Sequence, residues 1–436
     1  MTSTLATQHC LQTVTQLIIK VCLYLLVLLT PFIVGSPFTI APLFKINSLF
    51  IQSAIAMDPF RLTKEVFVQI VILLLAAVYL IKLSLAPVGA AEWDRARQLA
   101  RRPVGMALAL LVLLSAVSIF FSDNKALAWL DVMNVLLYAV LYLIVIQVAD
   151  KKVIKKLLYL ALAAGVINAI HVLLQYYGHD PFYQDLARAK AIGRYTAGGS
   201  LDNPNVAGIY FALALVSAIG LVFTAAVPWK RWLLAAGLFA LLAGLIYTQT
   251  LTAVAGFLAG MMTWAALRFR YEKAARKYLL AGIALLLVAG TILIGVNKGF
   301  RGRLASAAQT IQTRNWGDLL SQRNVWWRVS WDMIKSGPLL GHGIGSFNPS
   351  YFDYQREFTR RTGIKVALPH PGQLHNEYLQ LWLELGIVGL LLFLYALFAH
   401  LRLGCNLCLA RGPGKKTARR KSQKRKRKCT ARSSKI

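Results

Sequence analysis

The sequence predicts an all-α protein that crosses a membrane many times. Of its 436 residues, 57% are hydrophobic and only 15% are charged, whereas a soluble domain has about 45–50% apolar and about 25% charged residues. Apolar runs of about 17–25 residues recur along the chain, which is the length with which a helix crosses a bilayer. Because a span must satisfy its own backbone hydrogen bonds, we expect these runs to be helices.

About ten runs qualify as spans, with twelve as the upper bound. No basic region precedes the first run and no cleavage site follows it, so we expect a retained span there. The connection at 35–62 fits either an interfacial segment or an ordinary loop. The expected spans are residues 15–34, 63–86, 103–121, 126–149, 153–177, 204–227, 231–248, 250–268, 277–296 and 377–403.

Clusters of lysine and arginine assign the two sides of the membrane, because cytoplasmic loops carry an excess of these residues. Four clusters lie in short connections, at residues 95–102, 151–156, 230–231 and 268–277, and the tail after Arg411 is also basic. All five fall on one side if the N-terminus is cytoplasmic. We therefore predict a multi-pass protein of the bacterial inner membrane, with both termini in the cytoplasm.

Four segments follow from this topology. Residues 1–296 form a bundle of about nine spans, 297–376 a periplasmic loop domain, 377–403 the final span and 404–436 a basic cytoplasmic tail. The net charge of +32 would suggest nucleic acid in a soluble protein, but here most of it lies in short loops and the tail. We expect contacts with membrane lipids and none with nucleic acid.

The periplasmic loop holds eleven lysines and arginines against four acidic residues, which suggests an anionic ligand. Residues 318–336 are predicted to form a helix that ends at Gly337-Pro338. Its three tryptophans fall on nearly one face, as in a helix that lies at the membrane interface. They are Trp326, Trp327 and Trp331.

Two arginines of this helix are expected to have different surroundings. Arg323 lies one turn from Trp327, beside the buried face, whereas Arg328 points about 140° away from Arg323 by the helical period. The two are not expected to serve one ligand. For Arg328 we prefer a contact with lipid headgroups.

His375 is the leading candidate for a chemical role. Pro371 and Gly372 forbid helix further back, so His375 lies at or just before the start of the last span. The partial positive charge of a helix N-terminus keeps a histidine neutral near pH 7. A neutral imidazole at a membrane surface can act as a general base.

Polar side chains continue past His375 into the last span. Glu377, Gln380 and Glu384 recur on one stripe, which is expected to face a protein cavity rather than lipid. Possible partners of Glu384 inside the membrane are Asn168 and His171. His370 either orients substrate or caps the loop. Its spacing from His375 is not that of a zinc protease, so we expect no metal.

These residues resemble the O-antigen ligase and polymerase superfamily. The resemblance rests on SQRNVWWRVSWDMIKSGPLLGHGIGSF at 321–347, LHNEYLQLWLELGIVG at 374–389 and GRYTAGGSLDNPNVAG at 193–208. The family's outer Ser-Arg-Gly motif is absent, because the chain reads TQTLTAVAG at 248–256. Ligases of the family often have two further spans, in place of which this chain has its basic tail.

The resemblance implies a GT-C-like membrane glycosyltransferase of lipopolysaccharide biosynthesis that uses no cofactor. It implies transfer of a glycan from undecaprenyl diphosphate to a hydroxyl of lipid A–core on the periplasmic face. His375 corresponds to the catalytic histidine, and Arg323 and Arg194 to arginines that bind the diphosphate. His370, Asn376, Glu377 and Gln380 are the expected supporting residues. Direct attack by the acceptor would invert the anomeric carbon.

Three other functions compete with a ligase. A polymerase would share every motif but use a second lipid-linked glycan as acceptor. A protein O-oligosaccharyltransferase is less favoured, because the chain has no large soluble C-terminal domain. A transporter or flippase would also fit the spans, but it predicts internal repeats that the sequence does not show.

Overall fold

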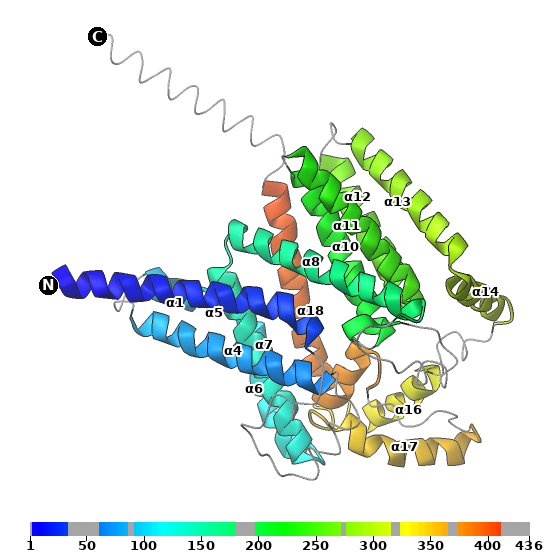
Figure 1. The fold of residues 1–436 in the computed structure, drawn as a ribbon. Helices are drawn as coiled ribbons and strands as arrows, with labels where there is room; N and C mark the ends of the chain where they lie inside the picture. Colours follow the sequence, from blue (N-terminus) through cyan, green and yellow to red (C-terminus); the bar gives the residue numbers. More distant parts are fainter. Residues whose placement is uncertain are drawn as a thin grey trace, which may run out of the picture.

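The computed structural model is helical throughout the part of the chain that it describes, and that part contains no strand. The described residues are 2–33, 61–85, 91–179, 197–201, 203–225, 227–271, 276–314, 323–364 and 373–410. Of the connection at 35–62, the structure describes only residues 61 and 62. The tail from residue 411 lies outside the described ranges. Figure 1 shows a bundle of long helices with α16 and α17 together at one end of it.

Nine described helices are long and apolar enough to cross a membrane. They are α1 (Thr2–Leu29), α4 (Arg61–Ser84), α6 (Pro103–Ser118), α7 (Lys125–Val148), α8 (Lys151–Tyr176), α10 (Pro204–Thr224), α11 (Pro228–Tyr247), α12 (Leu251–Tyr271) and α18 (Glu377–Ala410). The predicted fold class, a polytopic helical membrane protein, is confirmed.

The ninth predicted span corresponds to α13 (Arg276–Val296), which is followed after one residue by α14 (Lys298–Gln312) at an angle of 95°. Counting this bent pair as one span brings the described total to ten, in agreement with the predicted number. Figure 1 shows α14 turning away from the end of α13.

Short sequence signals explain where these helices begin. Proline occupies the first helical position of α6, α10 and α11, where its missing N–H costs nothing. Side chains cap two others: Asn124 accepts the N–H of Leu127, and Asp150 accepts those of Lys152 and Val153. These local signals set the ends of the spans without help from distant residues.

Two buried clusters hold the bundle together. The larger lies among α8, α10, α11 and α12, and the smaller among α1, α4, α7 and α8. Gly244 of α11 shows how closely the helices approach, because a Cβ there would lie 2.8 Å from the Cβ of Ala169 and 3.0 Å from the ring of Phe211. Small residues at such crossings are typical of helix packing in membranes.

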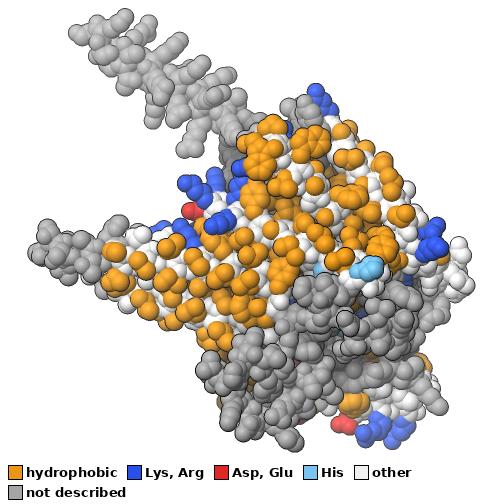
Figure 2. Space-filling model, viewed as in Figure 1, with side chains coloured by type: hydrophobic (Ala, Val, Ile, Leu, Met, Phe, Trp, Pro, Cys, Tyr) orange, Lys and Arg blue, Asp and Glu red, His pale blue; other side chains and the backbone are white. Residues whose placement is uncertain are grey.

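The outer faces of the helices are apolar. Figure 2 shows hydrophobic side chains over the visible helices, with lysines and arginines at the margins of this surface. Large exposed side chains include Leu17, Ile70, Leu213, Leu285 and Phe398. This distribution suits helices surrounded by lipid.

The segment between α13 and α18 contains α14, α16 (Arg323–Ser336) and α17 (Phe347–Thr362). Helix α16 ends before Gly337-Pro338, as predicted. The prediction that the three tryptophans share one helix face is wrong, because Trp326 is buried against protein whereas Trp331 is 42% exposed. The reason is the helical period, which separates side chains five residues apart by about 140°.

Candidate active site

A glycine-rich loop joins α16 to α17. Gly341, Gly343 and Gly345 all have positive φ angles, of 72°, 92° and 71°, which glycine adopts at little cost. A Cβ at Gly341 would lie 2.5 Å from the backbone of Glu384, and one at Gly343 would lie 2.5 Å from the backbone nitrogen of Ser122. The glycines therefore allow the loop backbone to touch the backbones of other helices.

This loop closes onto a kink in α18. Gly386 has φ 68° and ψ −176°, which interrupts the helix. A kink leaves helix carbonyls without their usual partners. Here the N–H of His342 donates to Leu383 O at 2.9 Å, and that of Gly343 to Glu384 O at 2.9 Å.

Helix α18 also donates a backbone hydrogen bond to the loop. The N–H of Ile387 donates to the carbonyl of Pro338 at 3.0 Å, and a Cβ on Gly386 would lie 2.0 Å from the carbonyl oxygen of Leu339. The Gly-x-Gly-x-Gly stretch and the Glu-x-Gly stretch are thus two sides of one backbone junction. It anchors the loop domain to the last span.

Glu384 supports this junction rather than the partners expected for it. Its carboxylate accepts the N–H groups of Gly345 and Phe347 and, at 3.4 Å, the side-chain amide of Gln380. The expected pairing with Asn168 is wrong, because the side-chain Nδ2 that would donate to a carboxylate has no hydrogen-bond partner among the described residues, while Oδ1 accepts the N–H of Ser200 at 2.9 Å. Glu384 is buried under the loop and acts on its position.

His375 lies two residues before α18, where the sequence places it. Its φ of 54° is in the left-handed region, which is uncommon for a residue with a side chain. Such strained backbone persists where surrounding contacts enforce it, and it clusters at functional sites. The imidazole stacks on the indole of Trp326, with ring centroids 5.7 Å apart and planes at 28°. The residue as a whole remains exposed to solvent.

Both neighbours of His375 are held in place. The carbonyl of Leu374 accepts the indole N–H of Trp327 at 3.2 Å, and its N–H donates to Gln380 Oε1 at 3.3 Å. Asn376 caps α18 by accepting the N–H of Leu379 at 3.2 Å. Two expected supporting residues, Gln380 and Asn376, thus position the histidine.

The third expected supporting residue of α18 differs from these two. Glu377 begins the helix and is exposed. A negative charge in the first turn favours the helix N-terminus. Glu377 therefore stabilises the start of α18, and it lies two residues after His375 in the sequence.

Arg323, the first residue of α16, completes the group. Partial burial lowers the pKa of the His375 imidazole, and the positive charge of Arg323 lowers it further. A lowered pKa keeps the ring neutral near pH 7 and able to accept a proton. The stack on Trp326 thus places His375 against the helix that begins with Arg323, 52 positions away in the sequence, and the lowered pKa favours the neutral imidazole.

Trp326 is a candidate site residue that the sequence interpretation missed. Its indole N–H is buried and has no hydrogen-bond partner among the described residues. Buried donors are normally satisfied, so this one is available to a ligand. The signal was its spacing, because a residue three positions after Arg323 shares its helix face.

Arg328 has a different environment. Its guanidinium lies 5.3 Å from the ring centroid of Phe358 on α17, so it contacts protein where a lipid headgroup was expected. It lines a groove together with Trp327, whose indole N–H donates to Leu374 beside His375. Arg194 and His370 lie outside the described residues.

The segment that follows Arg194 is anchored to α8. The N–H of Gly199 donates to Gln175 Oε1 at 2.7 Å, and the Ser200 hydroxyl donates to the carbonyl of Pro31 at 2.7 Å. Lys64 Nζ donates to the carbonyl of Ser200 at 2.8 Å. This part of the 193–208 stretch is thus fixed against three helical elements.

The turn that lacks the family's arginine lies between α11 and α12. Gln249 there has φ 54° and is buried. A Cβ on Gly299 of α14 would lie 2.3 Å from its amide nitrogen, so α14 packs closely over this turn. Thr250 donates its hydroxyl to the carbonyl of Pro204 at 3.0 Å.

Residues 236–394 match the family model described as O-antigen ligase. This stretch is similar to the O-antigen ligase family domain. The match runs from α11 into α18 and includes Arg323, the glycine loop and His375. The resemblance that the motifs indicate is thereby confirmed for this stretch of the chain.

A curated relative is an uncharacterized protein of Haemophilus influenzae. It is 24% identical over 119 residues, which cover 26% of this chain and 29% of the relative. The chain thus aligns with less than a third of the length of that relative. No solved structure matches the chain.

Proposed function

We propose that the protein is an O-antigen ligase of the bacterial inner membrane. It would transfer a glycan from undecaprenyl diphosphate to a hydroxyl of lipid A–core on the periplasmic face. The observation that carries this proposal is the stacking of His375 on Trp326 of α16, the helix that begins with Arg323, within the stretch that matches the O-antigen ligase family model. With both termini cytoplasmic, this site faces the periplasm.

The reaction needs two groups that this site supplies. The acceptor hydroxyl attacks the anomeric carbon, and its proton passes to the neutral imidazole of His375. The bond between the anomeric carbon and the diphosphate breaks, and both electrons leave with the diphosphate. Arg323 stabilises the negative charge that develops there, because a guanidinium binds phosphate oxygens in a two-pronged contact.

The stereochemical result follows from this mechanism. Displacement in one step, with no covalent intermediate on the protein, inverts the anomeric carbon. The guanidinium charge takes the part that a divalent cation often has in reactions of diphosphates. We therefore propose transfer without a metal, and we assign Arg194 as a second contact to the diphosphate.

The test is transfer by purified protein in detergent containing a chelator. Undecaprenyl-diphosphate-linked glycan is the donor, and either lipid A–core or a second lipid-linked glycan is the acceptor. We expect product only with lipid A–core, and inversion at the new linkage. Product only with the lipid-linked acceptor would identify a polymerase instead.

A further inference from the structure

A groove of about 540 Å³ lies between α16 and α17, beside the proposed active site. Trp327 lines the groove and also donates its indole N–H to the carbonyl of Leu374, next to His375. Leu379, in the first turn of α18, contributes to the same wall. The groove therefore shares residues with the segment that holds His375.

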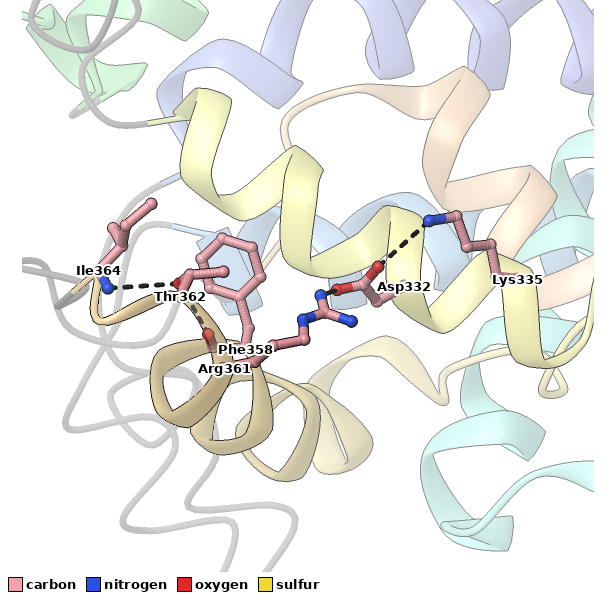
Figure 3. Close-up of polar contacts among 6 residues, drawn as sticks. All are labelled: Asp332, Lys335, Phe358, Arg361, Thr362 and Ile364. Carbon is pink, nitrogen blue, oxygen red and sulfur yellow. Dashed lines mark hydrogen bonds and ion pairs between the residues drawn. The ribbon is translucent and has the colours of Figure 1, made fainter.

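The groove holds a fixed carboxylate between two cations. Figure 3 shows Asp332 of α16 between Arg361 of α17 and Lys335 of its own helix. Arg361 makes a hydrogen-bonded ion pair with Asp332, and Lys335 Nζ lies 3.5 Å from Asp332 Oδ1. With Arg328 over the Phe358 ring, the groove carries three cations against one acid. It is suited to a ligand with negative charge.

Aromatic and amide groups form the remaining walls. Trp331 is 42% exposed, and an edge-to-face contact with Trp382 at 5.3 Å fixes its ring. Fixed aromatic faces offer apolar contact at little entropic cost. The Asn324 amide oxygen is buried and has no hydrogen-bond partner among the described residues, and Asn324 lines the groove. An unsatisfied acceptor here suits a hydroxyl donor.

We propose that this groove binds an acidic saccharide, one that carries a carboxylate or phosphate, as part of the acceptor substrate. The apolar face of a sugar ring would lie on Trp331, hydroxyls would donate to Asp332 and Asn324, and the anionic substituent would pair with Arg328. This assignment rests on the proposed function, because the hydroxyl that loses its proton to His375 belongs to the acceptor.

Binding of trigalacturonate to the purified full-length protein tests the proposal without any transfer step. We expect it to bind more tightly than the neutral maltotriose. Arg328→Gln and Trp331→Ala should each weaken it about tenfold, the loss expected for one strong contact. Arg360→Gln is the matched control, because Arg360 pairs with Glu357 at 2.8 Å on α17 and does not line the groove.

Several outcomes would overturn the proposal. One is equal binding of the charged and neutral saccharides, and another is unchanged trigalacturonate binding in both groove variants. Thermal unfolding of each variant shows whether a loss of binding reflects a lost contact or lost folding. If Trp331→Ala is unfolded and Arg328→Gln binds trigalacturonate normally, the proposal is also contradicted.

Competition distinguishes the sources of negative charge. Displacement of trigalacturonate by phosphatidylglycerol in nanodiscs, but not by free phosphate, would assign the groove to lipid headgroups and overturn the saccharide. His375→Ala separates this inference from the proposed function. It should lower transfer about a hundredfold or more and leave trigalacturonate binding unchanged, whereas a His375→Ala protein with near wild-type transfer would contradict the ligase mechanism and not the groove.

Discussion

The imidazole of His375 stacks on the indole of Trp326, with ring centroids 5.7 Å apart. This contact joins the segment just before α18 to the first turn of α16, which also carries Arg323. The proposed base and the guanidinium proposed to bind the diphosphate therefore depend on the same helix. Under the proposed mechanism, a change that moves α16 would disturb both proton transfer and the stabilisation of the leaving group.

His375→Ala should lower transfer about a hundred- to ten-thousandfold, the usual contribution of a general base. The variant should still insert and bind donor, because Leu374 and Asn376 make the hydrogen bonds that hold this junction. Glycan transfer to lipid A–core and binding of labelled donor are measured side by side. A rate near that of the wild type would move the role of base to another group.

Activity should fall as pH decreases through the pKa of His375. Only the neutral ring accepts a proton, and both partial burial and Arg323 lower this pKa from the ordinary value of 6.5. The acid limb of the rate profile should therefore lie below pH 6.5 in the wild type. Arg323→Gln removes this positive charge, so the acid limb of its residual activity should lie at a higher pH than that of the wild type. A limb above pH 6.5 in the wild type would contradict the assignment.

Arg323→Lys keeps the charge but loses the planar two-pronged contact with phosphate. Loss of one preorganised donor costs on the order of 2–4 kcal/mol in the transition state, about a hundred- to a thousandfold in rate. Arg328→Lys should affect donor turnover far less, because Arg328 packs over the ring of Phe358 on α17. The comparison uses single-turnover rates at saturating acceptor. Equal losses at the two positions would contradict the separation of these arginines.

Gly343→Ala should destabilise the protein by about 2–5 kcal/mol. The added Cβ would lie 2.5 Å from the nitrogen of Ser122 at a φ of 92°, so backbone strain and overpacking add. Thermal unfolding in detergent measures the effect. Gly302→Ala in α14 is the control, since nothing lies within 4 Å of its Cβ position, and alanine is favoured over glycine within a helix by about 0.5–1 kcal/mol.

The proposed topology is tested with single cysteines in a cysteine-free background. Arg356 on α17 is exposed, and Arg270 lies in the last turn of α12. In intact cells, a reagent that does not cross the inner membrane should label Arg356→Cys and not Arg270→Cys. Permeabilised cells should label both. The reverse pattern in intact cells would place the active site in the cytoplasm.

Much of the fold could be predicted from sequence because its signals are local. A bilayer-length apolar run defines a span, and the prolines of α6, α10 and α11 define helix starts. Gly337-Pro338 ends α16, and Pro371 and Gly372 place His375 before α18. Each of these signals acts within one turn of the residues that it concerns, so no distant partner is needed to interpret it.

The partners of the side chains were decided by the tertiary structure. The sequence did not show that Trp326 would stack on His375, that Glu384 would hold the glycine loop, or that Asn168 would bind Ser200. These contacts join segments brought together by helix packing, and several helix faces offered equally suitable polar partners. The amino-acid sequence by itself determined the spans and the residue types of the site. Packing of α16 and the glycine loop against α18 decided which of those residues meet, because only packing fixes distances between segments remote in the chain.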